Sequence, residues 1–480
     1  MNLKHWLSKN SFLLLILLFA IFLRFFKLDL QSLWVDELFS ANLSSPKLSF
    51  TEVLSNFKKT AHPPLYFIIL YFFTKVFGAT SLALKSLSAI LGVLGVYGIY
   101  KLGKELLNKN IGLLAAALLS FNYFHIYYSQ EARMYAFFFL LATWSFYLLV
   151  KFIKSPNKKS AILYGISAAM LINTHYFGLL TLAAQIVIMS YFLWKPYLIS
   201  RGKYLLLSGI SGLLVIISYL PVFKTVEGHS SVKSIWIPKP HYDSLKEVFK
   251  AFFGHSEVVV ILIILLVFLF IIKLTKIKNT KSFKIDPVKN KWVFTSFILI
   301  TWIIVGVFIP VYRSNAKVPI IIDRYFIHLI TPLLLICSIG LYSIKNQILR
   351  YGFLFTIVLF SILNLFFERW HYKGVYKSQL REVCAYIEKG NDVQVISSLG
   401  RHLIYYLPEK KIIERRLSNH IKELQKDSTL IQDFWYADGH TRKYSTTVVE
   451  EKFLKTKFVL QDSISLFDAW AKHYVLKQKK

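Results

Sequence analysis

The sequence predicts an all-α polytopic membrane protein that carries a small α/β domain at its C-terminal end. Hydrophobic residues make up 55% of the 480 residues, and apolar runs of membrane-spanning length recur along most of the chain. The last run is Phe353–Phe367, and after Glu368 a polar tail with short helix and strand patterns follows. We therefore expect a transmembrane module over residues 1–369 and a folded domain over residues 370–480.

The net charge of +32 does not indicate nucleic acid binding, because many lysines stand in short loops between apolar runs. There, basic residues set the orientation of membrane helices. We expect membrane lipids, and no nucleic acid, among the partners. Of the two cysteines, Cys337 lies in an apolar run and Cys384 in the tail, which predicts neither a disulfide nor a cysteine metal site.

The first apolar run, Phe12–Phe26, follows a basic start, which places the N-terminus in the cytoplasm. No small-residue cleavage site follows, so we interpret the run as a retained helix rather than a secretory signal. The segment 28–63 is then an external loop, within which Phe50–Phe57 has the apolar spacing of a short surface helix. Pro63 and Pro64 suit the first turn of the next helix, Leu65–Phe77.

The helix Leu65–Phe77 has two possible topologies. If it crosses the membrane, the next run, Leu82–Tyr100, leaves a cluster of lysines outside. If it lies along or dips into the surface, those lysines become cytoplasmic and all later loops alternate as the positive-inside rule requires. Its short apolar part favours the second topology, which gives about 11 crossings. The later external loops are then Tyr127–Tyr135, Asn173–Tyr176, about Phe223–His255, and Pro310–Arg324.

The tail has the pattern of a small α/β domain. Apolar residues at helical spacing predict a helix over Lys377–Lys389, with Gly390 as its C-terminal cap. Val393–Ser397 and Lys411–Glu414 are predicted strands around a helix near His402–Leu407, which makes a βαβ fragment. Lys457–Asp462 and His473–Lys477 are predicted as later strands.

The first candidate site is the Trp-Val-Asp-Glu stretch that ends in Asp36 and Glu37. Adjacent side chains on a helix point about 100° apart, so these carboxylates cannot face each other as the two acids of a glycosidase do. One of them can project into a cavity while the other holds a metal, an acceptor or the local structure. The structural alternative is a pair of acids at the N-terminus of a surface helix, where the helix dipole favours negative charge.

The second candidate is Glu131 and Arg133 in the stretch Ser-Gln-Glu-Ala-Arg-Met-Tyr. Charged side chains are costly inside a bilayer, so they face cavities or lie at the interface. Glu131 together with Asp36 can share a divalent cation or position an acceptor, and Arg133 can bind a phosphate. The alternative is a Glu–Arg pair that holds a loop at the lipid headgroups.

Further candidates stand at other helix ends. Arg324, in Asp-Arg-Tyr, is a second phosphate ligand or a headgroup-binding residue beside an aromatic belt. His62 binds phosphate or is satisfied at the interface, and for His175 interfacial packing is the favoured interpretation. Tyr66, Tyr135 and Tyr325 adjoin these motifs and are candidates for the cavity wall. No Walker loop, dinucleotide fingerprint or zinc-protease motif is present.

The order of these motifs resembles the bacterial membrane glycosyltransferases of the C superfamily. WVDE, HPPLYF, YYSQEARMY and RYF follow one another between residues 10 and 370. The branch that they resemble is related to the protein O-mannosyltransferases and to the transferase that adds aminoarabinose to lipid A.

The resemblance implies a hexosyl- or pentosyltransferase of cell-envelope glycosylation in the bacterial cytoplasmic (inner) membrane. Its active site and C-terminal domain face the periplasm, and it transfers a sugar, with inversion, from a polyprenyl-phosphate carrier. It also implies Asp36 as the general base, Glu131 as the second acidic residue, and His62, Arg133 and Arg324 as ligands of the carrier phosphate. Glu37 joins the catalytic candidates as the neighbour of Asp36.

The chemistry agrees with this assignment, because a polyprenyl phosphate leaving group needs electrostatic stabilisation and an acceptor hydroxyl needs only one base. The large β-trefoil insertion of the eukaryotic O-mannosyltransferases has no counterpart in this chain. The acceptor is thus a lipid, a glycan or a protein, and a divalent cation is possible but not required. The alternative function is a transporter or flippase of a lipid-linked sugar. Charges at the external helix ends and the absence of a repeated half favour catalysis.

Overall fold

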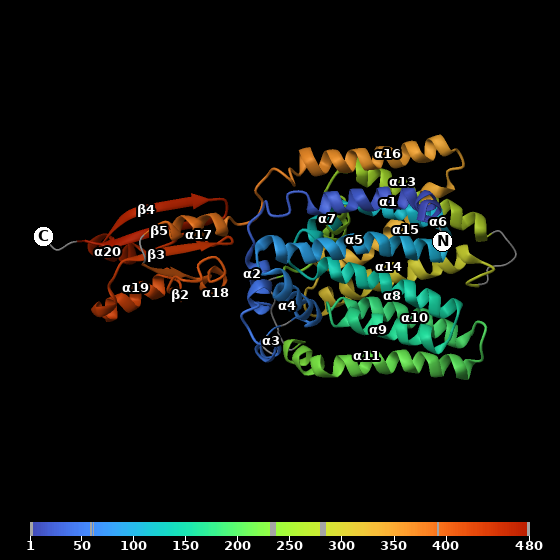
Figure 1. Cartoon of the computed structure of the whole chain (residues 1–480), viewed down its shortest axis with the longest axis horizontal. Helices are drawn as coiled ribbons and strands as arrows, with labels where there is room; N and C mark the ends of the chain where they lie inside the picture. Colours follow the sequence, from blue (N-terminus) through green and yellow to red (C-terminus); the bar gives the residue numbers. More distant parts are fainter. Residues whose placement is uncertain are drawn as a thin grey trace. The chain divides into compact units, whose positions relative to one another are not determined.

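The computed structural model describes residues 3–57, 60, 62–230, 237–278, 285–390 and 393–477 (Figure 1). Residues 58, 59 and 61 of the predicted loop 28–63 and residues 231–236 of the predicted loop Phe223–His255 lie outside the described residues, as do residues 279–284. The chain divides into two compact units. Unit 1 comprises Met1–Phe26, Leu48–Phe73 and Lys85–Tyr372, and unit 2 comprises Lys27–Lys47, Thr74–Leu84 and Lys373–Lys480. Unit 2 thus combines the first half of the predicted loop 28–63 with the C-terminal tail.

Unit 1 is helical, although α4 ends and α5 begins within unit 2. Both Phe50–Phe57 and Leu65–Phe77 have the bounds predicted from the sequence. The elements are α1 Leu3–Phe25, α3 Phe50–Phe57, α4 Leu65–Phe77, α5 Ser81–Leu106, α6 Lys109–Ser120, α7 Tyr123–Ser129, α8 Tyr135–Lys154, α9 Lys158–Ile172, α10 Gly178–Trp194, α11 Arg201–Ser230, α12 Ser244–Phe252, α13 Glu257–Lys278, α14 Lys291–Ala316, η1 Asp323–Leu329, α15 Ile330–Ser343, α16 Gln347–Leu363 and η2 Asn364–Glu368.

Among the described residues, seven helices are long and apolar enough to cross a membrane. An eighth span is present if α6 and α7, which meet at 66°, are counted as one broken span. Shorter apolar helices cover Asn10–Phe25, Leu65–Phe77 and Gly178–Trp194. The chain is therefore a multi-pass membrane protein, as its composition predicted.

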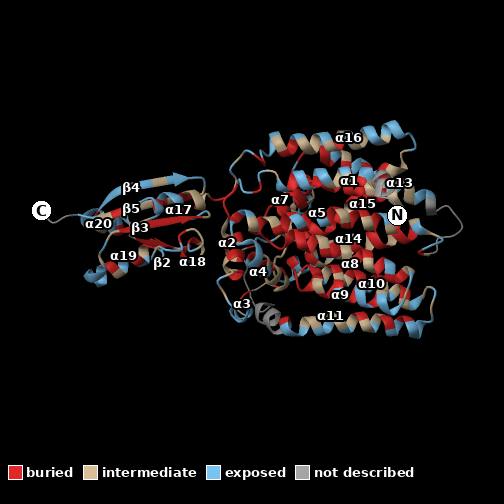
Figure 2. Ribbon diagram, in the orientation of Figure 1, coloured by how far each residue is buried: buried red, intermediate tan, exposed pale blue. Residues whose placement is uncertain are grey.

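The helices of unit 1 differ in how much of their surface other helices cover. Of the most apolar window of α8, 78% is buried, whereas for α11 and α16 only 17% is buried. Figure 2 shows these two helices largely exposed, and their exposed side chains are mostly apolar. Apolar side chains are at no disadvantage against lipid tails. We therefore infer that α11 and α16 face lipid, while α8 lies inside the bundle.

Close approach between two helices depends on one small residue. A Cβ atom on Gly340 of α15 would lie 2.0 Å from the carbonyl oxygen of Leu266 on α13. Glycine removes that clash and lets the two backbones touch, as small residues do between membrane helices. The contact between α13 and α15 is one of the most extensive in unit 1.

The predicted external loop Pro310–Arg324 begins seven residues too early. Helix α14 continues through Pro310 to Ala316, so only residues 317–322 connect it to η1. Proline usually marks the end of a helix because it lacks an N–H donor. Membrane helices tolerate proline in their interior because neighbouring groups satisfy the freed carbonyl.

Unit 2 is built on a five-stranded sheet of order β2-β1-β3-β5-β4. Strand β1 pairs in parallel with β2 and β3, and β5 runs antiparallel to β3 and β4. The strands are β1 Gln394–Ser397, β2 Ile412–Glu414, β3 Phe434–Gly439, β4 Phe458–Leu466 and β5 Ala469–Leu476. The helices are α2 Val35–Leu43, α17 Leu380–Glu388, α18 Gly400–Leu403, α19 Leu417–Lys426, η3 Ser428–Leu430 and α20 Val448–Lys457.

The predicted βαβ fragment is present as β1, α18 and β2, with Val395 opposite Ile412. Its helix ends at Leu403, earlier than predicted, and the C-terminal cap of α17 is Lys389 rather than Gly390. The sequence prediction missed β3, the central strand. All six of its residues are buried, so it lacks the polar alternation that marks a half-exposed strand.

One face of the sheet packs against α19 and α20 through Phe434, Tyr436, Phe458 and Tyr474. His420 of α19 belongs to this layer, is 3% exposed, and meets the Phe434 ring at 5.0 Å. In the described part of the chain neither ring nitrogen of His420 has a hydrogen-bond partner. Burial, with a smaller contribution from Arg415, lowers the pKa of His420 to about 4.

Unit 2 should therefore lose stability in mild acid. Between the unfolded pKa of about 6.5 and the folded pKa, the unfolded chain binds a proton at His420 that the folded chain does not. Stability thus falls as the pH drops from about 6.5 towards 4. We expect His420→Leu to reduce this pH dependence in thermal unfolding of the purified protein. The exposed His241, replaced by Leu, serves as the control, and an equal effect of both substitutions would contradict the assignment.

Candidate active site

The predicted site residues fall into two groups. Asp36 and Glu37 belong to unit 2, and the others belong to unit 1. Those in unit 1 are His62, Tyr66, Glu131, Arg133, Tyr135, His175, Arg324 and Tyr325. That Asp36 meets Glu131 stays a prediction.

Four of the unit 1 residues, three with aromatic rings and one arginine, form a cluster around the His175 ring. The His175 ring lies 5.1 Å from Tyr325, 6.0 Å from Tyr135 and 4.9 Å from Phe138, on which it stacks. The Arg324 guanidinium lies over Tyr135 at 5.7 Å and over Tyr325 at 5.9 Å. Tyr135, His175, Arg324 and Tyr325 thus lie together, and we call them the His175 cluster.

His62 and Arg133 lie within electrostatic range of the His175 cluster. Burial lowers the pKa of His175 well below its usual value, and the neighbouring His62, His328, Arg133 and Arg324 lower it further. His175 is therefore neutral at pH 7, and its Nδ1 accepts the backbone N–H of Phe177 at 3.1 Å. Two arginines from motifs far apart in the chain, Arg133 and Arg324, therefore lie near His175.

Two backbone links hold the motifs in place. The Leu65 N–H, just after the His-Pro-Pro stretch, donates to the Asn173 carbonyl at 3.0 Å. The buried Tyr66 hydroxyl lies 3.1 Å from the Ser88 hydroxyl, which donates to the Arg133 carbonyl at 3.2 Å. These contacts join α4, α5 and the loop before α8. Through Ser88, Tyr66 therefore helps to hold the backbone of that loop in position.

The loop that carries Glu131 and Arg133 is buried. Glu131 is 1% exposed and Arg133 is 2% exposed. The loop is shorter than predicted, because α7 extends to Ser129 and α8 begins at Tyr135. The Gln130 amide anchors it by donating to the Arg24 and Phe26 carbonyls at 3.0 and 3.1 Å and by contacting His371 Nε2 at 2.9 Å.

In unit 2, Asp36 and Glu37 occupy the first turn of α2 with different surroundings. Glu37 is fully buried and pairs with the Lys377 ammonium at 2.8 Å. It also accepts the Trp34 backbone N–H at 3.3 Å, as an acid in the first helical turn does. The structural alternative considered for the pair thus describes Glu37, whereas Asp36 is only partly buried.

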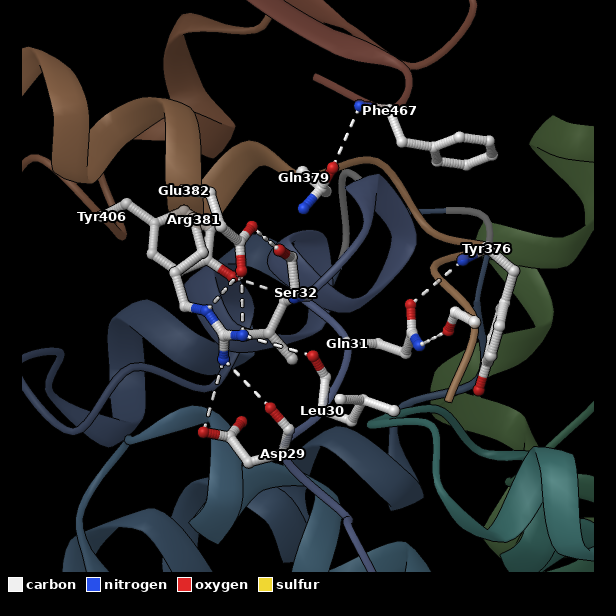
Figure 3. Close-up of polar contacts among 12 residues, drawn as sticks. Asp29, Leu30, Gln31, Ser32, Tyr376, Gln379, Arg381, Glu382, Tyr406 and Phe467 are labelled. Atoms are coloured by element: carbon white, nitrogen blue, oxygen red, sulfur yellow. Dashed lines mark hydrogen bonds and ion pairs between the residues drawn. The ribbon is translucent and has the colours of Figure 1, made fainter. Parts of the chain in front are cut away.

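The segment before α2 is fastened to residues that follow Lys373, as Figure 3 shows. The Gln31 amide donates to the Gly374 carbonyl at 2.7 Å and accepts the Tyr376 N–H at 3.2 Å. Arg381 donates to the carbonyls of Asp29 and Leu30. Further contacts join Ser32 to Glu382, the Leu33 N–H to the Tyr406 hydroxyl, and Asn42 to the Arg401 carbonyl. The backbone around Asp36 is therefore held by the C-terminal domain.

The carboxyl edge of the parallel strands lies beside α2. The Trp34 ring is 5.9 Å from His440, which follows β3. Burial lowers the pKa of the half-buried His402. The carboxylates of Glu414 and Asp36 oppose this shift, whereas Arg442 and His440 add to it. Asp36 and Arg442 thus both lie within electrostatic range of His402, at the edge where α/β sheets usually bind ligands.

Sequence reasoning missed two buried cations. Lys377 lies in a polar tail segment, where no local pattern marks it as a buried partner. Lys85 of α5 is 1% exposed, and a lone lysine in an apolar run is a signal that would have found it. Among the described residues, no group of three or more His, Cys, Asp or Glu is arranged to hold a metal ion.

Comparisons with known proteins find the same fold in solved structures. The structure of ArnT from Cupriavidus metallidurans in the apo state aligns with 97% of this chain and 98% of its own, with a TM-score of 0.63 and 11% identity. The same protein bound to undecaprenyl phosphate covers 98% of each chain with a TM-score of 0.58 and 11% identity. A third structure is that of the archaeal oligosaccharyltransferase AglB from Archaeoglobus fulgidus in complex with an inhibitory peptide and a dolichol-phosphate. It aligns with 90% of this chain and 70% of its own, with a TM-score of 0.58 and 11% identity.

Residues 61–221 match the model of the family described as dolichyl-phosphate-mannose-protein mannosyltransferase. No curated protein sequence matches the chain. The chain thus shares the fold of these structures, and its residues 61–221 resemble the mannosyltransferase family, in agreement with the resemblance that the motifs indicated. The matched segment contains His62, Arg133 and His175.

Proposed function

We propose that this protein is a glycosyltransferase that moves a sugar from a polyprenyl-phosphate-linked donor to an acceptor at the outer face of the bacterial cytoplasmic membrane. The observation that carries the proposal is that Arg133 and Arg324 lie within electrostatic range of His175, in a chain whose residues 61–221 match the mannosyltransferase family. The ArnT structure with undecaprenyl phosphate has the same fold, which supports a polyprenyl carrier.

In the proposed reaction, the Asp36 carboxylate takes the proton of an acceptor hydroxyl. That oxygen attacks the anomeric carbon, the bond from this carbon to the phosphate oxygen breaks, and the polyprenyl phosphate leaves. Direct displacement inverts the anomeric centre. Arg133, Arg324 and His62 stabilise the negative charge that develops on the phosphate, while Glu131 orients the acceptor or the cationic groups.

Glu37 supports this reaction by holding the first turn of α2 through Lys377, rather than by touching substrate. Its burial and its ion pair favour this role over direct catalysis. The sugar is a hexose or a pentose, and the acceptor is a lipid, a glycan or a protein. No step requires a divalent cation.

The membrane arrangement proposed with this function has 11 crossings. They are the seven long helices, the broken span α6–α7, and α1, α9 and α10. Helix α4 then lies along the external surface, residues 1–369 form the transmembrane module, and residues 370–480 form a periplasmic domain. Trypsin treatment of intact spheroplasts should cleave the C-terminal domain if this orientation is right.

The phosphate ligands can be tested with undecaprenyl phosphate itself, without knowledge of the sugar. We expect Arg133→Gln and Arg324→Gln each to weaken its binding by about tenfold or more, because a hydrogen bond to a charged group contributes roughly 1.5–3 kcal/mol. Isothermal titration calorimetry on the purified protein measures this. Arg313→Gln, on the exposed end of α14, is the matched control. Equal losses in all three variants, or none, would refute the assignment of the site.

A further inference from the structure

A groove opens on the C-terminal sheet of unit 2, between the loop after β3 and the hairpin of β4 and β5. Its volume is about 580 Å³, within the range of small-molecule sites. The loop contributes Arg442, Lys443 and Tyr444, and β5 contributes Trp470 and Lys472. Ser463 and Ser465 of β4, which pair with Lys472 and Trp470 in the sheet, add exposed hydroxyls to its wall.

Two aromatic rings give the groove a rigid wall. Tyr444 and Trp470 meet edge to face at 5.5 Å, and the Trp470 indole N–H donates to the Arg442 carbonyl at 2.9 Å. The Tyr444 hydroxyl is 2.8 Å from that of Tyr474 in the core. Both rings are only half-buried, so part of each is left for a ligand. A half-exposed ring with one fixed edge suits the apolar face of a sugar.

The charge of the groove is positive. Arg442 and Lys443 are exposed, and the Lys472 ammonium lies 3.5 Å from the centre of the Tyr444 ring. The acid in its wall, Asp468, is engaged by the Thr441 N–H at 2.6 Å and by the Ser378 hydroxyl. Glu451, which is within electrostatic range of Lys472, is paired with Lys455 at 2.8 Å.

Arg442 is held in place at the carboxyl edge of the sheet. Its guanidinium donates to the Ser398 hydroxyl at 2.9 Å and lies 3.7 Å from the buried Asp438 carboxylate. Asp438 in turn accepts hydrogen bonds from Ser398 and Tyr436. A guanidinium fixed in this way presents its remaining N–H groups without a large loss of side-chain entropy.

The groove lies at the end of unit 2 that carries Asp36. Its first residue, Thr441, follows His440, whose ring contacts Trp34, and His402 is in electrostatic range of both Arg442 and Asp36. We propose that this groove binds an anionic saccharide of the acceptor, a sugar that carries a carboxylate or a phosphate. This inference rests on the proposed function, because it assigns the acceptor side of the same reaction.

The test titrates the full-length purified protein by calorimetry with two probes, the negatively charged trigalacturonate and the uncharged maltotriose. We expect trigalacturonate to bind at least about tenfold more tightly than maltotriose. Lys443→Glu and Arg442→Glu should each weaken the binding of trigalacturonate by about tenfold or more, which is the contribution of one charge-assisted contact. Lys422→Glu, an exposed reversal on α19, should change nothing. Equal affinity for both probes, or no effect of the reversals at the groove, would overturn the proposal.

A second arm separates a saccharide from a lipid headgroup. Vesicles of phosphatidylglycerol should not displace trigalacturonate, and displacement by them would overturn the saccharide assignment in favour of a lipid surface. The Asp36→Asn variant should bind trigalacturonate as the wild type does. Normal sugar transfer without this binding defeats the groove proposal alone, whereas binding in a protein that transfers no sugar defeats the proposed function alone.

Discussion

Replacing Asp36 by Asn is expected to abolish sugar transfer while the protein still folds and inserts. The asparagine amide has nearly the same shape but cannot take the proton of an acceptor hydroxyl. General bases typically contribute about 10²–10⁴-fold to a rate, so kcat should fall by at least about 10². Because Asp36 is partly exposed in the first turn of α2, the loss of its charge should change the unfolding temperature little. Transfer is measured as undecaprenyl phosphate released from the lipid-linked donor.

A matched control stands seven residues earlier. Asp29 lies in the same segment, is exposed, and pairs with Arg381 at 3.4 Å. Asp29→Asn makes the same chemical change beside the same domain and should leave kcat within about twofold, since exposed ion pairs contribute only about 0–1 kcal/mol. Wild-type activity in Asp36→Asn would remove Asp36 from the mechanism. An equal loss of kcat in both variants would show that the substitutions act by disturbing the loop rather than by removing a general base.

The second large effect is expected at Lys377. Replacing it by Met removes the cation that lies 2.8 Å from the fully buried Glu37 carboxylate. Breaking a buried ion pair by deleting one partner costs on the order of 3–5 kcal/mol. We expect Lys377→Met to lower the unfolding temperature of the purified protein clearly and to reduce transfer, because the turn that carries Asp36 is no longer fastened.

The double variant Glu37→Gln with Lys377→Met separates charge from packing. It leaves no buried carboxylate, and the glutamine oxygen still accepts the Trp34 N–H. We expect it to be more stable than Lys377→Met alone, since replacing both partners of a buried pair is often nearly neutral. Recovery of stability together with kcat supports a positioning role for the ion pair. A double variant as unstable as the sum of the single ones would refute the pairing, because coupled residues should not behave additively.

Local patterns were sufficient to predict much of the fold. The bounds of α3 and α4 followed from apolar spacing and from two prolines, and both are decided within a few residues of chain. The parallel pair β1 and β2 was also predicted, because a short helix between two strands permits few arrangements. The motif residues His175, Arg324, Tyr135 and Tyr325 were proposed separately and lie together in unit 1.

What could not be predicted depends on distant partners. The aromatic strand β3 is buried on both faces, so nothing in its own sequence distinguishes it from another buried segment. Pro310 marks a helix end by its own chemistry, yet α14 continues to Ala316, since membrane helices tolerate an interior proline. The role of Glu37 depends on Lys377, which is 340 residues away, and no local signal connects the two.

The central claim is that this protein breaks the bond between a sugar and a polyprenyl phosphate. The most direct measurement reconstitutes the purified protein in vesicles made from its own envelope lipids, which hold native donor and acceptor, and follows both by mass spectrometry. We expect undecaprenyl phosphate and an acceptor heavier by one sugar to appear in equal amounts with the wild type, and neither to appear with Asp36→Asn. Transit of intact lipid-linked sugar across the vesicle membrane in both proteins, with no undecaprenyl phosphate released, would contradict the claim and identify a flippase.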